Sequence, residues 1–558
     1  MLATLDWVLI GAYFVIIVGI VWWSAGRQST SADYFLAGRD VAWFAVGASL
    51  FASNIGSEHI VGLAGSGARN GMAQAHWELH AWVLLLLAWV FVPFYYQSGV
   101  FTMPQFLERR FDARSRWVLS IVSLVAYVFT KVSVTVYAGA VVFRTLLPDT
   151  FGSPDNAFWV GAVATVVLTG IYTVFGGLRA VVYTEVLQTG LLLLGSICIT
   201  ALGLAALGGW GELQRSIAVD PARFALWRPN SDPSFPWLGV LIASPIIGVW
   251  YFCTDQYIVQ RTLAARSLAD ARRGAIWGGA LKLWPVLIFL VPGMIGYALH
   301  RKGVMPIPVG ADGQVLGDQV FPTMVASLLP IGLRGLVVGG LLSALMSSLA
   351  SLFNSCATLF TVDIYEKLRP GRPERHLVHV GRLATAGVVG LGLLWIPIMK
   401  SLAEGGGGLY DYLQNVQGFL APPIVAVFLL GLFNRRINAR GALWGLGLGF
   451  VLGMGKLTAQ TLVRSGVLAP TGPIGALGAF NAYYFTGVLF LVSIVLVLAI
   501  SYASPPPAPE QIDGLTYWST TPSQREERRE SVGLPDYLGT GFVLTMVLVL
   551  YLYFSFWV

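Results

Sequence analysis

Long apolar runs recur from one end of the chain to the other, and they predict its architecture. Each run is close to the roughly 20 residues that an α-helix needs to cross the hydrocarbon core of a bilayer. Short polar segments separate the runs, which predicts an all-α polytopic membrane protein. About 14 transmembrane helices are expected, at residues 7–25, 41–67, 77–97, 117–145, 157–176, 181–208, 236–257, 274–299, 331–360, 378–399, 408–433, 441–463, 478–502 and 537–557.

Composition agrees with this reading. Of 558 residues, 56% are hydrophobic and only 11% are charged, whereas soluble domains carry about 25% charged residues. We therefore expect one polytopic domain instead of several soluble ones. Cys198, Cys253 and Cys356 all lie in apolar runs without the spacing of a disulfide framework, so free thiols are expected.

The net charge of +7 is spread over short loops, so membrane orientation explains it better than nucleic-acid binding does. Most Lys and Arg residues fall in alternate loops, beginning with the loop after the first span. The positive-inside rule makes that side cytoplasmic and places both termini outside the cytoplasm. The lack of long cysteine-rich external loops favours a bacterial inner membrane over an animal cell surface.

A polar interruption at Ser53 to Ser57 lies in the middle of the second apolar run. Unpaired backbone groups are costly in hydrocarbon, so a broken helix persists only where protein or a water-filled cavity supplies partners. Transporters built from inverted repeats place such breaks at corresponding positions of two halves. The matching stretch is Ser244 to Gln256, interrupted by Pro245 and Gly248. The alternative is a helix that is merely kinked.

These two stretches suggest a division of the chain into halves with additions at both ends. The first half is expected at 41–208 and the second at 236–433. An additional helix precedes them in 1–30, and further helices follow in 441–558. The segment of about 504–536 is expected to be a solvated, passive cytoplasmic linker.

A serine-rich stretch at 341–355 supplies hydroxyl groups that could complete a cation site. Sodium is a hard ion that prefers oxygen ligands. Main-chain carbonyls at Ala52 and Ile55, together with the hydroxyls of Ser347 and Ser348, would provide neutral oxygens. The alternative is that these small residues only let helices pack closely.

Ionisable residues within predicted spans are expensive and are usually functional, although structural ion pairs are the competing explanation. A polyhydroxylated solute needs many hydrogen-bond donors and acceptors, and an aromatic ring at Tyr251 or Phe252 could cover the apolar face of a sugar. No nucleotide-binding or catalytic motif is present, so an enzyme is not expected. The ionisable residues are Glu78, Lys131, Glu185, Lys282 and Asp411, and the candidate solute contacts are Asn54, His59, Glu78, Lys282 and Gln414.

Several long motifs carry a resemblance to a known family. They include FASNIGSEHIVGLAGSGA from Phe51, FTMPQFLERRF from Phe101 and WYFCTDQYIVQRTLAA from Trp250. Over residues of about 30 to 445 the chain resembles the sodium-glucose cotransporter branch of the sodium:solute symporter family. The resemblance implies a LeuT-type 5+5 inverted-repeat fold with extra helices at both ends. It also implies sodium-coupled import of a hexose such as glucose or galactose by alternating access.

The resemblance assigns roles to individual residues. The family's sodium site corresponds to Ala52, Ile55, Ser347 and Ser348, and the resemblance adds the carbonyl of Ala344 as a further ligand. Its sugar positions fall on the five candidate contacts, with Tyr251 as the inner gate and Phe252 where family members often have Trp. Glu185 takes the acidic position near the cytoplasmic sodium exit, with a gating role.

Three residues depart from the family pattern. Glu58 adds a carboxylate beside the sugar pocket, which leaves the identity of the sugar open. Thr135 replaces a residue that is commonly polar or acidic. Ala350 replaces the Thr or Ser of a second sodium site, so we predict one sodium per sugar.

Other readings remain open from the sequence. The solute could instead be myo-inositol, another monosaccharide, a sialic acid, an amino acid or a carboxylate, and the protein could be a sodium-dependent sugar sensor without net accumulation. The expected partners are a small sugar, sodium and membrane lipid, with no organic cofactor and no nucleic acid. A monomer is expected, although the sequence does not fix the oligomeric state.

Overall fold

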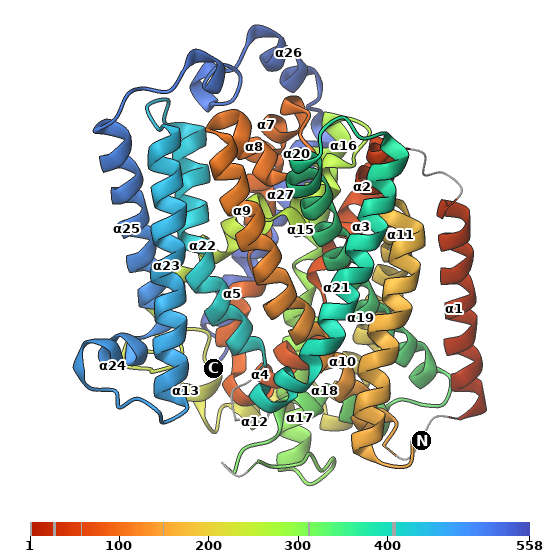
Figure 1. The fold of residues 1–558 in the computed structure, drawn as a ribbon. Helices are drawn as coiled ribbons and strands as arrows, with labels where there is room; N and C mark the ends of the chain where they lie inside the picture. Colours follow the sequence, from red (N-terminus) through yellow and green to blue (C-terminus); the bar gives the residue numbers. More distant parts are fainter. Residues whose placement is uncertain (1–2, 26–29, 57, 149, 311–312, 404–408) are drawn as a thin grey trace.

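The computed structural model describes residues 3–25, 30–56, 58–148, 150–310, 313–403 and 409–558. The side chains of Glu58 and Asp411, which the sequence singled out, lie outside the described part. The remaining chain forms a bundle of long helices, with α26 at one end and both marked chain ends at the other (Figure 1). Within the described ranges there is no extended strand, only three isolated bridges. A helical chain satisfies its backbone hydrogen bonds internally, as hydrocarbon requires.

The helices that build the bundle follow the predicted order. Those up to residue 207 are α1 (Thr4–Ala25), α2 (Ser31–Leu36), α3 (Trp43–Asn54), α4 (Ala64–Asn70), α5 (Ala75–Glu78), α6 (Ala81–Leu86), α7 (Val92–Ser98), α8 (Met103–Arg110), α9 (Ala113–Ala126), α10 (Ser133–Leu146) and α11 (Pro154–Leu207). Those up to residue 368 are α12 (Trp210–Ile217), α13 (Pro221–Phe224), α14 (Trp237–Val249), α15 (Gln256–Leu263), α16 (Leu268–Leu281), α17 (Val291–Arg301), α18 (Val320–Leu328), α19 (Leu333–Thr358) and α20 (Glu366–Leu368). The remaining ones are α21 (Glu374–Ala403), α22 (Leu409–Phe433), α23 (Ala439–Arg464), α24 (Gly472–Ala479), α25 (Ala482–Tyr502), α26 (Pro522–Glu530) and α27 (Leu534–Ser555).

In the described part of the chain, six π-helical segments interrupt or extend these helices. Such segments are rare and occur often at functional sites. They are η2 (Glu58–Leu63), η4 (Leu87–Phe91), η5 (Tyr127–Val132), η6 (Trp250–Thr254), η7 (Val286–Leu290) and η9 (Leu359–Tyr365).

Eleven helices in the described chain are long and apolar enough to cross a membrane, fewer than the 14 spans expected. Part of the difference is that predicted spans run together. α11 contains two of them, separated at Gly177, where φ is 57°. The run His59–Ser98 likewise joins the end of the second span, after its break, to the third span. The fourth span is built of shorter pieces, α9, η5 and α10. Each of the 14 predicted spans is mainly helical, while the number of crossings stays a prediction, as does the division into halves at 41–208 and 236–433.

The outside of the bundle is strongly apolar. Trp22 is 83% exposed, Leu394 is 75% exposed and Leu491 is 62% exposed. Soluble proteins seldom gather so many large apolar side chains on one surface. This surface therefore faces lipid. The three cysteines are free thiols, as expected.

The predicted break in the second apolar run is confirmed. α3 ends at Asn54, Ile55 has non-helical dihedrals (φ −90°, ψ 87°), and helical structure resumes at Glu58. The second break occurs at a different place from the one expected. α14 continues through Pro245 and Gly248, and the interruption follows at Asp255, which is extended. A proline removes one backbone donor, which a membrane helix tolerates, whereas Asp255 ends η6 and caps α15 with its carboxylate.

The segment of about 504–536 is not the passive linker that its composition predicted. It folds over the ends of the helices and contains α26. The guanidinium of Arg528 lies 4.1 Å from the ring centroid of Phe94 in α7. Trp518 Nε1 donates a hydrogen bond of 3.1 Å to the carbonyl of Phe433, at the end of α22. These contacts anchor the segment to the bundle.

α4 and α17 pack so closely that only glycine fits between them. A Cβ added to Gly293 would lie 1.9 Å from the carbonyl oxygen of Ala64, and one added to Gly67 would lie 2.3 Å from that of Leu290. Small residues allow this approach of two backbones in a membrane protein. Because α4 continues from η2, which follows the break, the contact also helps to fix the position of the broken stretch.

We therefore expect Gly293→Ala to destabilise the protein severely, since a backbone oxygen cannot rotate away from the new methyl group. The loss in free energy of unfolding should be about 3 kcal/mol, at the upper end of the usual cost of overpacking. Thermal unfolding of purified protein in detergent would measure it. Gly190→Ala is the matched control, because a Cβ at that exposed helical position meets nothing within 4 Å. Equal stability of the two variants would contradict the packing argument.

Candidate functional site

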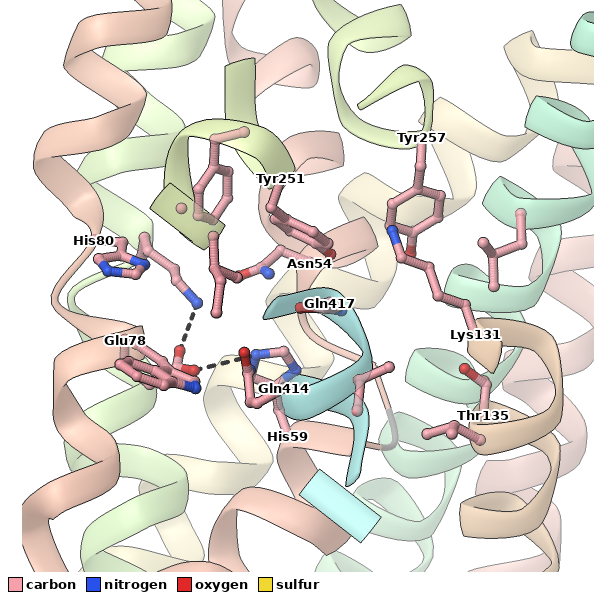
Figure 2. Close-up of a pocket in the computed structure, with 18 residues that line it drawn as sticks. Asn54, His59, Glu78, His80, Lys131, Thr135, Tyr251, Tyr257, Gln414 and Gln417 are labelled. Atoms are coloured by element: carbon pink, nitrogen blue, oxygen red, sulfur yellow. Dashed lines mark hydrogen bonds and ion pairs between the residues drawn. The ribbon is translucent and has the colours of Figure 1, made fainter. Parts of the chain in front are cut away.

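One cavity brings together all seven residues that the sequence suggested for solute binding (Figure 2). Its accessible volume of about 50 Å³ has room for roughly four water molecules. A hexose is larger, so its walls would have to move outward to admit one. The seven residues are Asn54, His59, Glu78, Tyr251, Phe252, Lys282 and Gln414.

Irregular backbone positions many of these side chains. Asn54 is the last residue of α3, at the break. His59 belongs to η2, and Tyr251 and Phe252 belong to η6. A π-helical turn shifts the register of a helix, so it can turn towards the cavity side chains that a regular α-helix would direct elsewhere.

A buried ion pair forms one end of the cavity. Lys282 Nζ donates a hydrogen bond of 2.5 Å to Glu78 Oε2. His59 Nε2 lies 3.3 Å from Glu78 Oε1. All three side chains are at most 7% exposed. Buried charges persist only when they are paired, so Glu78 and Lys282 hold each other in position and present their remaining donor and acceptor sites to the cavity.

Lys131 and Thr135 lie at the opposite end of the cavity in the same view (Figure 2). Lys131 Nζ forms an ion pair of 2.6 Å with Asp255 Oδ2. It also lies 4.6 Å from the ring centroid of Tyr251 and 4.5 Å from that of Tyr257. The pair joins η5 to the break between η6 and α15. Tyr251, the expected gate, is therefore held beside a paired cation.

Several residues of the cavity wall carry buried polar atoms that have no hydrogen-bond partner among the described residues. These atoms include Asn54 Oδ1, Trp77 Nε1 and His80 Nε2. A buried polar group without a partner is costly, so such groups mark places where a ligand or water binds. A solute rich in hydroxyl groups would satisfy both a donor and an acceptor here.

The residues expected at the sodium site are all buried, at no more than 2% exposure. Ser347 Oγ donates a hydrogen bond of 3.3 Å to the carbonyl of Ala52, which joins α19 to the end of α3. Ile55 follows at the break, and Ala344 lies one turn before Ser348. Within the described chain, Ser348 Oγ has no hydrogen-bond partner.

Glu185 of α11 lies directly against this cluster. Its Oε1 accepts hydrogen bonds from Ser53 at 2.7 Å, Ser351 at 2.6 Å and Ser347 at 3.2 Å. Ser49 donates to Oε2. Arg261 Nη2 lies 3.6 Å from Oε1 and provides a counter-charge. The Glu185 carboxylate thus accepts a hydrogen bond from Ser347, which is one of the proposed sodium ligands. The sequence predicted only neutral oxygen ligands at this candidate cation site.

A further contact links the two broken helices. The hydroxyl of Tyr257, at the start of α15, donates to the carbonyl of Ser53 near the end of α3. The helix ends next to the two breaks therefore meet beside the cavity.

Residues 34–449 match the model of the sodium:solute symporter family. This chain belongs to that family. It is a sodium-coupled solute symporter, and members of the family are transporters that need no organic cofactor.

The relatives of this symporter are named after different solutes, glucose and myo-inositol. Sodium/glucose cotransporter 2 of Rattus norvegicus is 39% identical over 559 residues, covering 94% of this chain and 82% of the relative. The sodium/myo-inositol cotransporter of Canis lupus familiaris is 38% identical over 554 residues, covering 93% and 76%. Sodium/glucose cotransporter 1 of Oryctolagus cuniculus is 36% identical over 525 residues, covering 88% and 78%.

Solved structures show the fold of the symporter. A Na⁺-coupled sialic acid symporter in a substrate-bound outward-open state superposes with a TM-score of 0.74 at 22% identity, covering 90% of this chain and 98% of that one. Mhp1, a nucleobase-cation-symport-1 family transporter, gives 0.51 at 15% identity, covering 87% and 98%. The symporter therefore has the LeuT-type fold that the resemblance implied.

Some cavity residues were not found from the sequence. Trp77 and His80 flank Glu78 within an apolar run, where an aromatic residue indicates packing or a membrane interface. Tyr257 is uncharged and follows directly after the stretch Ser244 to Gln256. The available signal was their proximity to Glu78 and to the second break. Thr135, noted only as a departure from the family, lies in the cavity wall.

Proposed function

We propose that this symporter imports a neutral hexose, such as glucose or galactose, together with one sodium ion. The observation that carries the proposal is a cavity whose lining residues include both the Glu78–Lys282 pair and residues with unpartnered polar atoms. The cavity lining offers many hydrogen-bond donors and acceptors, and the charges of Glu78 and Lys282 are paired with each other. Such a lining suits an uncharged solute with many hydroxyl groups. The sodium/glucose relatives support the same solute class.

The coupling ion is proposed to bind at Ala52, Ile55, Ala344, Ser347 and Ser348. These residues join the broken helix to α19, so an ion held between them stabilises one arrangement of the two elements. If that arrangement also binds solute better, sodium and solute raise each other's affinity by the same factor. Release of both on the other side follows when the arrangement changes, with Tyr251 and Glu185 as gating residues.

A stoichiometry of one sodium per sugar rests on Ala350, which is buried and has no hydroxyl for a second ion. One charge crossing 100 mV contributes about 2.3 kcal/mol, or roughly fifty-fold accumulation before the sodium gradient is added. A second ion would square that factor. Reversal potentials of reconstituted protein, measured at several sugar ratios, distinguish the two stoichiometries.

Orientation and location are part of the proposal. Figure 1 shows both chain ends opposite α26, and the basic loops around α8 and α26 define the proposed cytoplasmic end. A bacterial inner membrane stays a prediction, and the relatives named above are mammalian.

The deciding experiment is uptake of labelled sugar into liposomes containing the purified protein. We expect glucose or galactose to accumulate with an inward sodium gradient and not with potassium in its place. Unlabelled myo-inositol is included as a competitor, because the sodium/myo-inositol relatives make it the second candidate. Counterflow without a gradient separates a transporter from a sensor, which would bind sugar but not exchange it. The absence of uptake for every sugar and polyol would contradict the proposal.

A further inference from the structure

His80 is a buried imidazole at the Glu78 end of the cavity (Figure 2). Its side chain is 4% exposed, and within the described residues Nε2 has no hydrogen-bond partner. His80 lies at the turn between α5 and α6, where a side chain often caps the following helix, but this one makes no capping hydrogen bond. A residue of the cavity wall therefore carries a buried polar atom without a structural use among the described residues.

Neighbouring rings fix the orientation of the imidazole. Trp77 stacks with it at a centroid distance of 6.2 Å and an interplanar angle of 17°. Trp82 meets it edge-on at 6.4 Å and 89°. A side chain held by packing on two sides loses little further freedom when it binds a ligand. The arrangement is that of a preorganised binding group.

Gly248 of α14 provides the space that His80 occupies. A Cβ at this position would lie 2.9 Å from His80 Nδ1 and 3.1 Å from Cε1. Any larger residue would push the imidazole away from its place in the wall. Gly248 on α14 and His80 before α6 are therefore complementary in size.

We propose that His80 is a specificity-determining residue whose Nε2 forms a hydrogen bond with one hydroxyl of the solute held at the Glu78–Lys282 pair. This inference rests on the proposed function and names the part of the same cavity that distinguishes one hydroxylated solute from another. A site that hydrogen-bonds a solute hydroxyl rejects the analogue that lacks it, because its own buried polar group is then left unpaired. Gly248 makes this contact possible by leaving room for the ring.

The test compares uptake of the transported hexose with uptake of its monodeoxy analogues, each lacking one hydroxyl. Full-length protein in liposomes is used, with a sodium gradient. The unsubstituted protein should prefer the parent sugar to one particular analogue by about tenfold or more. His80→Phe should reduce that one ratio to about twofold or less, and leave the other ratios and the sodium dependence unchanged.

His76→Phe is the matched control. His76 is also buried, but its Nε2 lies 3.1 Å from the carbonyl of Leu226 and its Nδ1 lies 3.3 Å from the hydroxyl of Tyr551, outside the cavity lining. Its loss should affect stability and leave every uptake ratio unchanged.

Gly248→Ala provides a second route should His80→Phe fail to fold. In the otherwise unsubstituted protein, Gly248→Ala should lower the ratio of parent-sugar uptake to uptake of that one monodeoxy analogue. In a His80→Ala background it should have no further effect on this ratio. Retention of every ratio within about twofold in both His80→Phe and Gly248→Ala would overturn the proposal. If the unsubstituted protein takes up no sugar or polyol at all, the proposed function itself fails and the His80 assignment falls with it, a result that needs no variant to recognise.

Discussion

Lys282→Ala is expected to remove most sugar uptake and to destabilise the protein. The ammonium group lies 2.5 Å from Glu78 Oε2, and both side chains are almost fully buried. Removing one member of a buried pair leaves an uncompensated charge, at a cost of about 3–5 kcal/mol. Losing the contacts of this pair to a solute should lower uptake by roughly a hundredfold, the equivalent of one or two charge-assisted hydrogen bonds.

A double variant separates these two effects. Glu78→Gln combined with Lys282→Met removes both charges and keeps similar side-chain volumes. Its thermal stability should recover most of what Lys282→Ala loses, because no charge is left unpaired. Its sugar uptake should stay at the level of the single variant. Normal uptake by the double variant would mean that the pair only supports the fold and that the cavity assignment is wrong.

Ser348→Ala should raise the sodium concentration needed for half-maximal uptake by about tenfold, the equivalent of one lost ligand. The hydroxyl has no hydrogen-bond partner in the described chain, so its removal breaks no contact of the fold. Thermal stability without sodium should therefore stay unchanged, while the stabilisation that added sodium provides should shrink. Titration with sodium in detergent, with potassium as the reference ion, measures both quantities.

Ser24→Ala is the control for this substitution. Ser24 is also fully buried, and its hydroxyl likewise lacks a partner among the described residues, but it lies in α1. The variant should keep the sodium dependence of the unsubstituted protein. Ser348 would be removed from the proposed ligand set if its variant showed the same sodium dependence as this control.

The position of Glu185 shows how packing adds to a correct prediction. An acidic residue in an apolar run was expected to be functional because ionised groups are expensive in hydrocarbon. Its surroundings could not be predicted, since Ser49, Ser53 and Ser351 come from helices far away in the sequence. The structure brings their hydroxyl groups and Arg261 around one carboxylate, and it places that carboxylate one hydrogen bond from Ser347.

The two helix breaks also show which features local sequence predicts and which depend on packing. The first could be predicted because glycine, serine and asparagine interrupt an apolar run within a few residues, which is a local signal. The second could not be placed accurately. Proline and glycine at positions 245 and 248 are the stronger local signal, but the helix continues through them. Asp255 ends it because Lys131 and Tyr127, both distant in sequence, contact its carboxylate.

The sequence by itself determined that this is a helical membrane protein and where its apolar spans lie. It also identified the polar residues inside those spans that were expected to be functional. Those properties depend on the cost of placing each residue in hydrocarbon, which local composition expresses. The tertiary structure alone decided that Trp77, His80 and Gly248 share a cavity wall with Glu78 and Lys282. Contacts of that kind depend on which helices meet and at what separation, and no local stretch of the chain carries that information.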